Sequence, residues 1–308
     1  MKYVFGPVHS RRLGLSLGVD PVQDKTCTLD CVYCQLGSTA LKTVKRGVYA
    51  PAEAVLDEVR SVIDYGKKID YITFSGTGEP TLNVELGNMI SEIKTMSGVP
   101  IAVITNSTFL HLENVRADLM QADLVVPSVD AVSKQVFESI NRPHHDINLK
   151  QLLNGLETFS HAYTGKLWVE IMLVRGINDT DEELQALANY LNRLDCEKIQ
   201  INTVTRPPAE SSCAAVDDDV LDRARNLFGS RSEVIGAFSQ TGGAVNDAEP
   251  CTRIHALVRS HPCTLEQLCS TLGLSSEQAE KALAILIDRQ TVEQAGHGSK
   301  IFYRASGR

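Results

Sequence analysis

The sequence predicts an α/β protein in which repeated strand–helix units build a parallel sheet and a small domain follows at the C-terminal end. Short apolar or β-branched runs alternate with longer amphipathic stretches from residue 15 to about residue 228, which is typical of βα units around a parallel sheet. Further along, residues 251–308 show three short helical patterns and then a hairpin pattern, the order of a winged helix-turn-helix. We therefore expect two domains, residues 1–245 and 251–308.

The predicted strands are six short runs rich in apolar and β-branched residues, at 15–19, 71–75, 101–105, 124–128, 167–174 and 199–204. Two of the helices predicted between them, 51–65 and 181–194, carry apolar residues at helical spacing. Six such units form either an open doubly wound sheet or a partial barrel, and periodicity does not distinguish the two. In both architectures ligands gather at the carboxyl ends of the strands, so the polar residues that follow each strand are candidate site residues.

The C-terminal domain is expected to follow a linker at 239–250, SQTGGAVNDAEP. Thr264 and Ser275 are expected helix N-caps, Gly273 separates the second and third helices, and the hairpin turns near residues 296–298. The expected recognition helix, 277–290, has three acidic and two basic side chains, a balance that disfavours phosphate binding, although the hairpin is more basic. Weak contact with a nucleic acid and contact with a protein therefore both stay open for this domain.

Composition narrows the class of protein. With 43% hydrophobic and 22% charged residues, the 308-residue chain is ordinary for a globular protein. No apolar run approaches the about 20 residues of a membrane-spanning helix, and the apolar stretch after Arg11 and Arg12 ends at Asp20, too early for an export signal. A net charge of −8 gives no general attraction to nucleic acid. Eight cysteines without regular disulfide spacing predict reduced thiols and a cytoplasmic location.

Three of these cysteines, Cys27, Cys31 and Cys34, lie within eight residues in the pattern C-x3-C-x2-C. Thiolates are the preferred ligands of iron–sulfur clusters, and a compact loop can offer three of them to three corners of one cube. A fourth local cysteine is absent, and an open coordination position is typical of a catalytic centre that binds a small molecule. The alternatives are three cysteines together by chance, or a zinc site completed by His9 or a distant cysteine.

This motif, in the loop after the first strand of a six-unit βα array, resembles the radical S-adenosylmethionine superfamily. The resemblance implies a partial (β/α)6 TIM-like barrel, a 4Fe-4S cluster held by the three cysteines, and S-adenosylmethionine bound at the open iron. It places Tyr33 near the adenine. The stretch FSGTGEPTL after the second strand resembles the superfamily's glycine-rich segment, which implies that Gly76, Thr77, Gly78 and Glu79 lie beside the methionine amino group.

Later strand ends supply further residues that the resemblance places near the cofactor's carboxylate and ribose, with Ser128 and Glu170 favoured over Asn106, Asp130 and Met172. Helix capping is the alternative for Asn106 and Asp130, and core packing is the alternative for Met172. Other polar groups either line the mouth of the barrel or belong to solvated loops: Arg142, His144, His145, Asp146, Arg175, Asn178, Asp179, Asn202, Arg206 and Glu210.

Within the superfamily, residues 1 to about 245 resemble the branch of wyosine-base synthases, through the segments 5–20, 140–146 and 201–210. Those synthases carry additional cysteines upstream for a second cluster, whereas no cysteine precedes Cys27 here. The remaining cysteines are widely spaced, so a second cluster has little support; they are Cys196, Cys213, Cys251, Cys263 and Cys269.

The resemblance implies an enzyme that cleaves S-adenosylmethionine with one electron and uses the resulting 5′-deoxyadenosyl radical to abstract hydrogen from a substrate. Its branch implies a modified nucleobase, as a nucleoside or within tRNA. A peptide or small metabolite is the alternative substrate, and a non-catalytic regulator that senses the cluster or S-adenosylmethionine is the alternative function. No flavodoxin-like segment is present in the chain, so we expect an external one-electron donor of the flavodoxin or ferredoxin kind.

Overall fold

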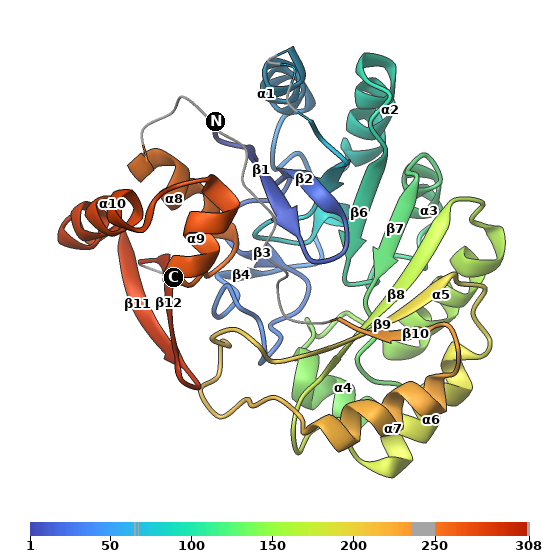
Figure 1. Ribbon diagram of the computed structural model, residues 1–308. Coiled ribbons are helices and arrows are strands. Elements are labelled where there is room, and N and C mark those ends of the chain that lie inside the picture. The colour runs from blue at the N-terminus through green and yellow to red at the C-terminus, as the bar shows by residue number, and fades with distance from the viewer. Residues whose placement is uncertain (65, 67, 236–249, 307–308) are drawn as a thin grey trace.

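The computed structural model describes residues 1–64, 66, 68–235 and 250–306 (Figure 1). Its main feature is an eight-stranded sheet with the order β1-β2-β5-β6-β7-β8-β9-β10. The first two strands pair antiparallel and every later pair is parallel. The strand order follows the chain without reversing, which excludes the doubly wound arrangement. The strands are β1 (Val4–Ser10), β2 (Gly14–Val19), β5 (Tyr71–Phe74), β6 (Ile101–Thr105), β7 (Leu124–Pro127), β8 (Lys166–Leu173), β9 (Lys198–Thr203) and β10 (Ser232–Val234).

The six predicted strands correspond to β2 and β5 to β9, with ends that differ by at most one residue. Strands β1 and β10 were not predicted. Strand β1 contains a Gly-Pro pair, Gly6 and Pro7, which interrupts the alternation of a regular strand, and its register against β2 shifts between Phe5 and Val8. Strand β10 has three residues, too few for a periodic signal. Two further short strands, β3 (Thr26–Cys27) and β4 (Leu41–Lys42), frame the cysteine loop.

Helices connect the parallel strands and bury their apolar faces against the sheet. The predicted helix 51–65 is α1 (Ala52–Asp64), and the predicted helix 181–194 is α6 (Asp181–Leu191), which Thr180 caps by accepting from the Glu183 amide. The others are η1 (Pro80–Leu82), α2 (Leu86–Met96), α3 (Glu113–Leu119), α4 (Lys134–Asn141), α5 (Leu149–Ala162) and α7 (Asp218–Phe228). None of the helices in the described residues is long and apolar enough to cross a membrane.

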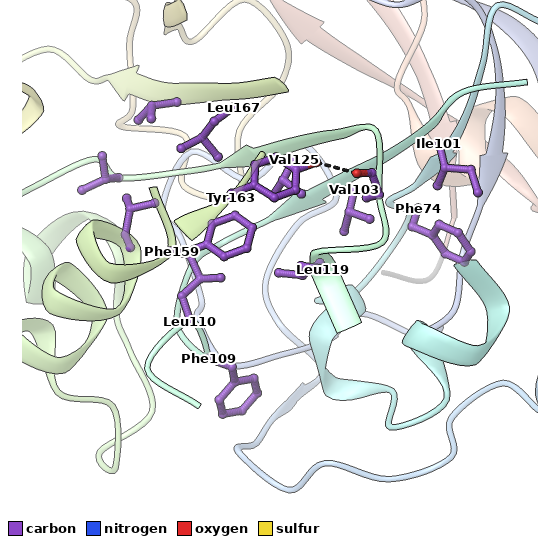
Figure 2. Close-up of a cluster of buried hydrophobic side chains, with 14 of the residues drawn as sticks. Phe74, Ile101, Val103, Phe109, Leu110, Leu119, Val125, Phe159, Tyr163 and Leu167 are labelled. Carbon is purple, nitrogen blue, oxygen red and sulfur yellow. Dashed lines mark hydrogen bonds between the residues drawn. The ribbon is translucent and has the colours of Figure 1, made fainter. Parts of the chain in front are cut away.

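The main core lies between the sheet and these helices (Figure 2). Val103 and Val125 project from neighbouring strands toward Leu119 of α3, and all three are fully buried. Phe159 and Tyr163 stack with ring centroids 4.8 Å apart at the end of α5. This continuous packing fixes the strands, and therefore the loops at their carboxyl ends.

The C-terminal tail consists of α8 (Pro250–Ser260), α9 (Leu265–Leu272), α10 (Ser276–Asp288) and a hairpin of β11 (Val292–His297) and β12 (Lys300–Ala305). Capping boxes at Thr264 and Ser275 start α9 and α10, as predicted from these residue types. Gly273 ends α9 with a positive φ of 63°. The expected linker 239–250 lies, apart from Pro250, outside the described residues, as does the expected boundary between the two domains.

The tail packs against the first strand of the sheet (Figure 1). Phe5 and Val8 of β1 belong to the same buried cluster as Leu257 of α8 and Leu268 of α9. On the hairpin, His297 Nε2 lies 3.2 Å from the carbonyl oxygen of Val204, which follows β9. The tail therefore contacts both the first strand and the segment after the sixth parallel strand.

Candidate active site

The three loop cysteines each face a side-chain nitrogen. Asn106 Nδ2 donates to Cys27 Sγ at 3.4 Å, and Lys25 Nζ donates to Cys34 Sγ at 2.7 Å. The same kind of contact joins Asn141 Nδ2 to Cys31 Sγ at 3.3 Å. All three cysteines are free of disulfides. Donors directed at sulfur stabilise the thiolate, which is the form that binds a metal.

Burial disfavours the charged form of these thiols. It raises the pKa of Cys27 to about 11, with a further contribution from the Glu79 carboxylate. Burial, followed by the charge of Asp130, raises the pKa of Cys31 as well. For Lys25, burial alone would lower the pKa, but the neighbouring thiolates of Cys34 and Cys27 outweigh it and raise the pKa. Lys25 supplies one positive charge beside these thiolates, and a bound metal centre would supply more.

The sulfur atoms of the three loop cysteines are not all close enough to one another to bind a single zinc ion. Two thiolates each about 2.3 Å from one zinc ion lie about 4 Å apart. Within the described residues, the group of three or more potential ligands that lie within 4.8 Å of one another is His144, His145 and Asp146, not the loop cysteines. Asn141 Oδ1, beside Cys31, is moreover buried without a partner in the described part of the chain, as expected where a ligand belongs. The residues present therefore fit an iron–sulfur cluster.

The glycine-rich stretch lies directly against the start of the cysteine loop. Gly76 has φ +123°, and a Cβ there would collide with Asp20, which accepts from both the amide and the hydroxyl of Thr77. A Cβ on Gly78 would collide with the carbonyl oxygens of Thr26 and Val22. Both glycines are therefore required for this close approach.

Glu79 is buried, and its carboxylate is fully engaged. It accepts from the Thr81 amide and hydroxyl at 3.1 and 2.6 Å, from the Thr105 hydroxyl at 2.6 Å and from the Asn106 amide at 2.8 Å. Burial raises its pKa, and these hydrogen bonds oppose the rise. Glu79 therefore positions η1 and the end of β6, and a contact with the cofactor's ammonium stays a prediction.

Asp130 joins the aromatic residue of the cysteine motif to the sheet. It accepts from Tyr33 Oη at 2.5 Å, from Asn141 Nδ2 at 2.7 Å and from the Met172 amide at 2.9 Å. Burial raises its pKa, opposed first by the Tyr33 hydrogen bond. Helix capping is not its role, because the N-cap of α4 is Ser133.

Asn106 is not a helix cap either, since α3 has Leu112 at its N-cap position. It lines, with Ser128, Asp130 and Tyr33, a small cavity of about 40 Å³ beside the cysteine loop. Met172 is partly buried in the core cluster under this loop and also faces the larger cavity, so both interpretations of it apply.

The larger cavity, about 340 Å³, is bordered by Tyr33, Cys34, Gly76, Glu170 and Met172. Glu170 Oε2 forms an ion pair of 2.6 Å with Arg12, and Glu170 Oε1 accepts from Asn202 at 2.5 Å. An isolated β-bridge pairs Ser128, directly after β7, with Glu170 of β8, so the two favoured residues lie side by side. Seven of the ten predicted cofactor residues thus border two cavities that share Tyr33, whereas Thr77, Gly78 and Glu79 line neither cavity.

The family model of the radical SAM superfamily matches residues 25–191, more than half of the chain. The chain belongs to the radical SAM superfamily. It is an enzyme of this superfamily, whose members use a 4Fe-4S cluster and S-adenosylmethionine. A UPF0026 protein of Methanocaldococcus jannaschii is 38% identical over 238 residues, covering 77% of this chain and 73% of that protein. A protein named GTPase Obg from Brachyspira hyodysenteriae is 33% identical over 95% of this chain, but the chain spans only 44% of that protein.

Solved structures support the radical SAM fold. A radical SAM methyltransferase from Sphaerobacter thermophilus superposes with a TM-score of 0.55 at 18% identity, covering 71% of this chain and 65% of that chain. TYW1 with a lysine-pyruvate adduct bound superposes with a TM-score of 0.53 at 15% identity, covering 74% and 76%. At these identities the likeness concerns the fold alone.

Sequence reasoning missed several charged groups of this radical SAM site. Lys25 has a left-handed φ of 52° that turns the chain into the cysteine loop, and no periodic pattern identifies it. Arg11 and Arg12, considered above only in connection with an export signal and with the resemblance of segment 5–20, line the larger cavity together with Arg206. The Arg-Arg pair was visible in the sequence, but the partners of Arg12, Glu170 and Gln200, lie far away along the chain.

Proposed function

We propose that this protein reductively cleaves S-adenosylmethionine and abstracts a hydrogen atom from a small substrate held in the 340 Å³ cavity. The observation that carries the proposal is the position of the glycine-rich stretch against the cysteine loop. The Glu79 amide donates to Thr26 O at 3.1 Å, and Cys34 and Gly76 border the same cavity. Three thiols beside a glycine-rich backbone segment, which a ligand can approach closely, are suited to a cluster that leaves one iron open to a small molecule.

In this proposal Cys27, Cys31 and Cys34 hold three irons, and Lys25, Asn106 and Asn141 direct hydrogen bonds at their sulfurs. With one electron from an external flavodoxin- or ferredoxin-like donor, a cluster and S-adenosylmethionine bound at this site would supply a 5′-deoxyadenosyl radical and methionine. The chain positions the substrate C–H against that radical and excludes other hydrogen donors, so that 5′-deoxyadenosine and a substrate radical form. Free thiols and a low-potential donor fit a cytoplasmic setting.

The cofactor contacts proposed from the resemblance are consistent with this arrangement. Tyr33, Gly76, Glu170 and Met172 border the larger cavity, where we place the adenosyl group, and Asn106, Ser128 and Asp130 border the smaller one. The sheet, with strands in chain order, is proposed to be a partial (β/α)6 barrel over residues 1–245.

The tail, residues 251–308, is proposed to be a winged helix-turn-helix domain that closes the cavity rather than one that reads DNA. Its residues Leu257, His261, Cys263 and Thr271 line the cavity. On α10, the helix expected to contact DNA, exposed Lys281 is already paired with Glu277 at 2.7 Å. The regulator alternative needs a helix with a surplus of positive charge, which α10 lacks.

The resemblance to the wyosine branch supports a nucleobase as the substrate. Because the tail covers the cavity, a free nucleoside or another small metabolite fits the structure better than a base within tRNA. Weak contact between the basic hairpin and a nucleic acid is a second expectation, and it does not depend on which substrate the cavity binds.

The test is anaerobic. Protein reconstituted with iron and sulfide receives dithionite and S-adenosylmethionine, and 5′-deoxyadenosine is quantified for the wild type, Cys31→Ala and the control Cys196→Ala. Cys196 is buried in the main core, away from both cavities. We expect product from the wild type and the control and none from Cys31→Ala. A wild type that holds a reducible cluster and yet forms no 5′-deoxyadenosine would exclude catalysis.

A further inference from the structure

The larger cavity has an unusual distribution of charge for an acidic protein. Its walls come from the turn 11–13 between β1 and β2, the segment 203–206 after β9, the cysteine loop and the tail. The permanently charged side chains among its lining residues are Arg11, Arg12, Arg206 and Glu170. Three guanidinium groups thus face one carboxylate, in a chain whose net charge is −8.

The single carboxylate forms an ion pair with one of the three arginines, and its charge also acts on Arg11. Arg12 Nη1 lies 2.6 Å from Glu170 Oε2 and also donates to Gln200 Oε1 at 2.9 Å. Arg206 Nη1 donates to a neutral acceptor, Gln35 Oε1, at 2.7 Å. Arg11 makes no hydrogen bond or ion pair with any other residue that the structure describes.

The arginines also affect one another. Burial, followed by the charges of Arg206 and Arg12, lowers the pKa of Arg11 to about 10, so it stays charged at neutral pH. Burial and the three arginines lower the pKa of His261, on the tail side, to about 3, so this ring is neutral. Repulsion between guanidinium groups costs free energy that a bound anion would recover.

We propose that Arg11 and Arg206 bind a carboxylate or phosphate group of the substrate, which makes the substrate of this radical enzyme an anionic small molecule. A guanidinium matches the two oxygens of such a group and is the side chain best suited to hold it. The proposal rests on the function proposed above and adds the chemical class of the substrate. The tail then covers the bound anion from the side of His261 and Cys263.

The carboxylate of S-adenosylmethionine is a second source of the same chemistry. Gly76 and Glu170, both proposed cofactor contacts, border the cavity that contains the arginines. The experiment therefore has to separate loss of substrate-anion binding from loss of cofactor binding.

Inorganic phosphate and malonate serve as probes, titrated calorimetrically into anaerobic, cluster-loaded protein saturated with S-adenosylmethionine. We expect saturable binding of at least one probe to the wild type. Arg11→Gln and Arg206→Gln each weaken it by about tenfold or more, because each removes a charge-assisted contact. Arg60→Gln, an exposed arginine whose ion-pair partner is Asp57, is the control and leaves probe binding unchanged. The affinity for S-adenosylmethionine, measured separately, stays within about twofold in all variants.

Three results would overturn the proposal: no saturable probe binding to the wild type, unchanged probe binding in both variants, or a loss of S-adenosylmethionine affinity that matches the loss of probe binding. The last would assign the arginines to the cofactor. If Arg206→Gln loses its cluster, Arg11→Gln decides alone, because Arg11 has no hydrogen bond or ion pair within the described residues to lose. Arg11→Lys keeps the charge and recovers part of the binding.

Probe binding and 5′-deoxyadenosine formation are independent measurements. A protein that forms 5′-deoxyadenosine but binds neither probe keeps the proposed function and loses this inference. A protein that binds a probe but forms no 5′-deoxyadenosine keeps the anion site at the arginines and loses the proposed function.

Discussion

The neutral His261 predicts a specific loss of stability in acid. An unfolded histidine has a pKa near 6.5, whereas burial and the arginines hold the folded pKa at about 3. The folded pKa lies below the unfolded one, so the contribution to stability is complete above pH 6.5 and is lost as the pH falls toward 3. Between pH 7 and pH 5 only the unfolded state takes up the proton, which costs about 2 kcal/mol.

The assay is urea denaturation of the anaerobic protein in chloride buffers at pH 7, 6 and 5, followed by circular dichroism. The His261→Gln variant lacks this titration, so its loss of stability between pH 7 and pH 5 should be smaller than that of the wild type by about 2 kcal/mol. His145→Gln changes a histidine whose side chain is 82% exposed and serves as the control. Equal losses in the wild type and His261→Gln would refute the reasoning, because they would mean that the folded ring takes up its proton in this range.

Three further predictions concern the cluster and the tail. Gly78→Ala should abolish cluster assembly, measured as bound iron, because its Cβ collides with two carbonyl oxygens, whereas Gly47→Ala, which has open space, should not. Lys25→Met removes a positive charge 2.7 Å from Cys34 Sγ and should lower the cluster's midpoint potential, followed by electron paramagnetic resonance, by on the order of 50–100 mV, equivalent to about 1–2 kcal/mol. An unchanged potential would place Lys25 outside the cluster's field. Phe5→Ala removes a ring shared with the tail's buried cluster and should weaken tail packing by about 3 kcal/mol, seen as faster limited proteolysis within residues 250–306.

Strands β2 and β5 to β9 were predictable because each is a short run rich in apolar and β-branched residues, whereas the three residues of β10 are too few for a pattern. Strand β1 was not predictable, because Gly6 and Pro7 break the alternation and pairing with β2 restores the strand only in the folded sheet. The tail helices were predictable from local capping chemistry, which requires only Thr264, Ser275 and the residues three positions later. Local sequence signals thus identify most helices and strands, whereas a strand such as β1 depends on its pairing with another strand of the sheet.

The same distinction holds for the site. The cysteine motif and the glycine-rich stretch are contiguous, so their chemistry can be read from residue types and spacing. The charged network cannot, because Arg12 reaches Glu170 across 158 positions and Arg206 reaches Gln35 across 171. Sequence offers no local reason to bring these side chains together.

The charges on the tail indicate whether it contacts a nucleic acid or a small molecule in the cavity. A domain that reads nucleic acid presents positive charge to solvent, whereas α10 presents an internal Glu277–Lys281 pair and the hairpin pairs Arg304 with Glu293 at 2.7 Å. Inside the cavity, the tail contributes His261, which burial and the three arginines keep neutral by lowering its pKa to about 3. A neutral ring covers the cavity without adding to the repulsion between guanidinium groups, and a bound anion is left as the group that relieves it. The tail is therefore better suited to enclose a negatively charged small molecule than to carry the rest of the chain to DNA.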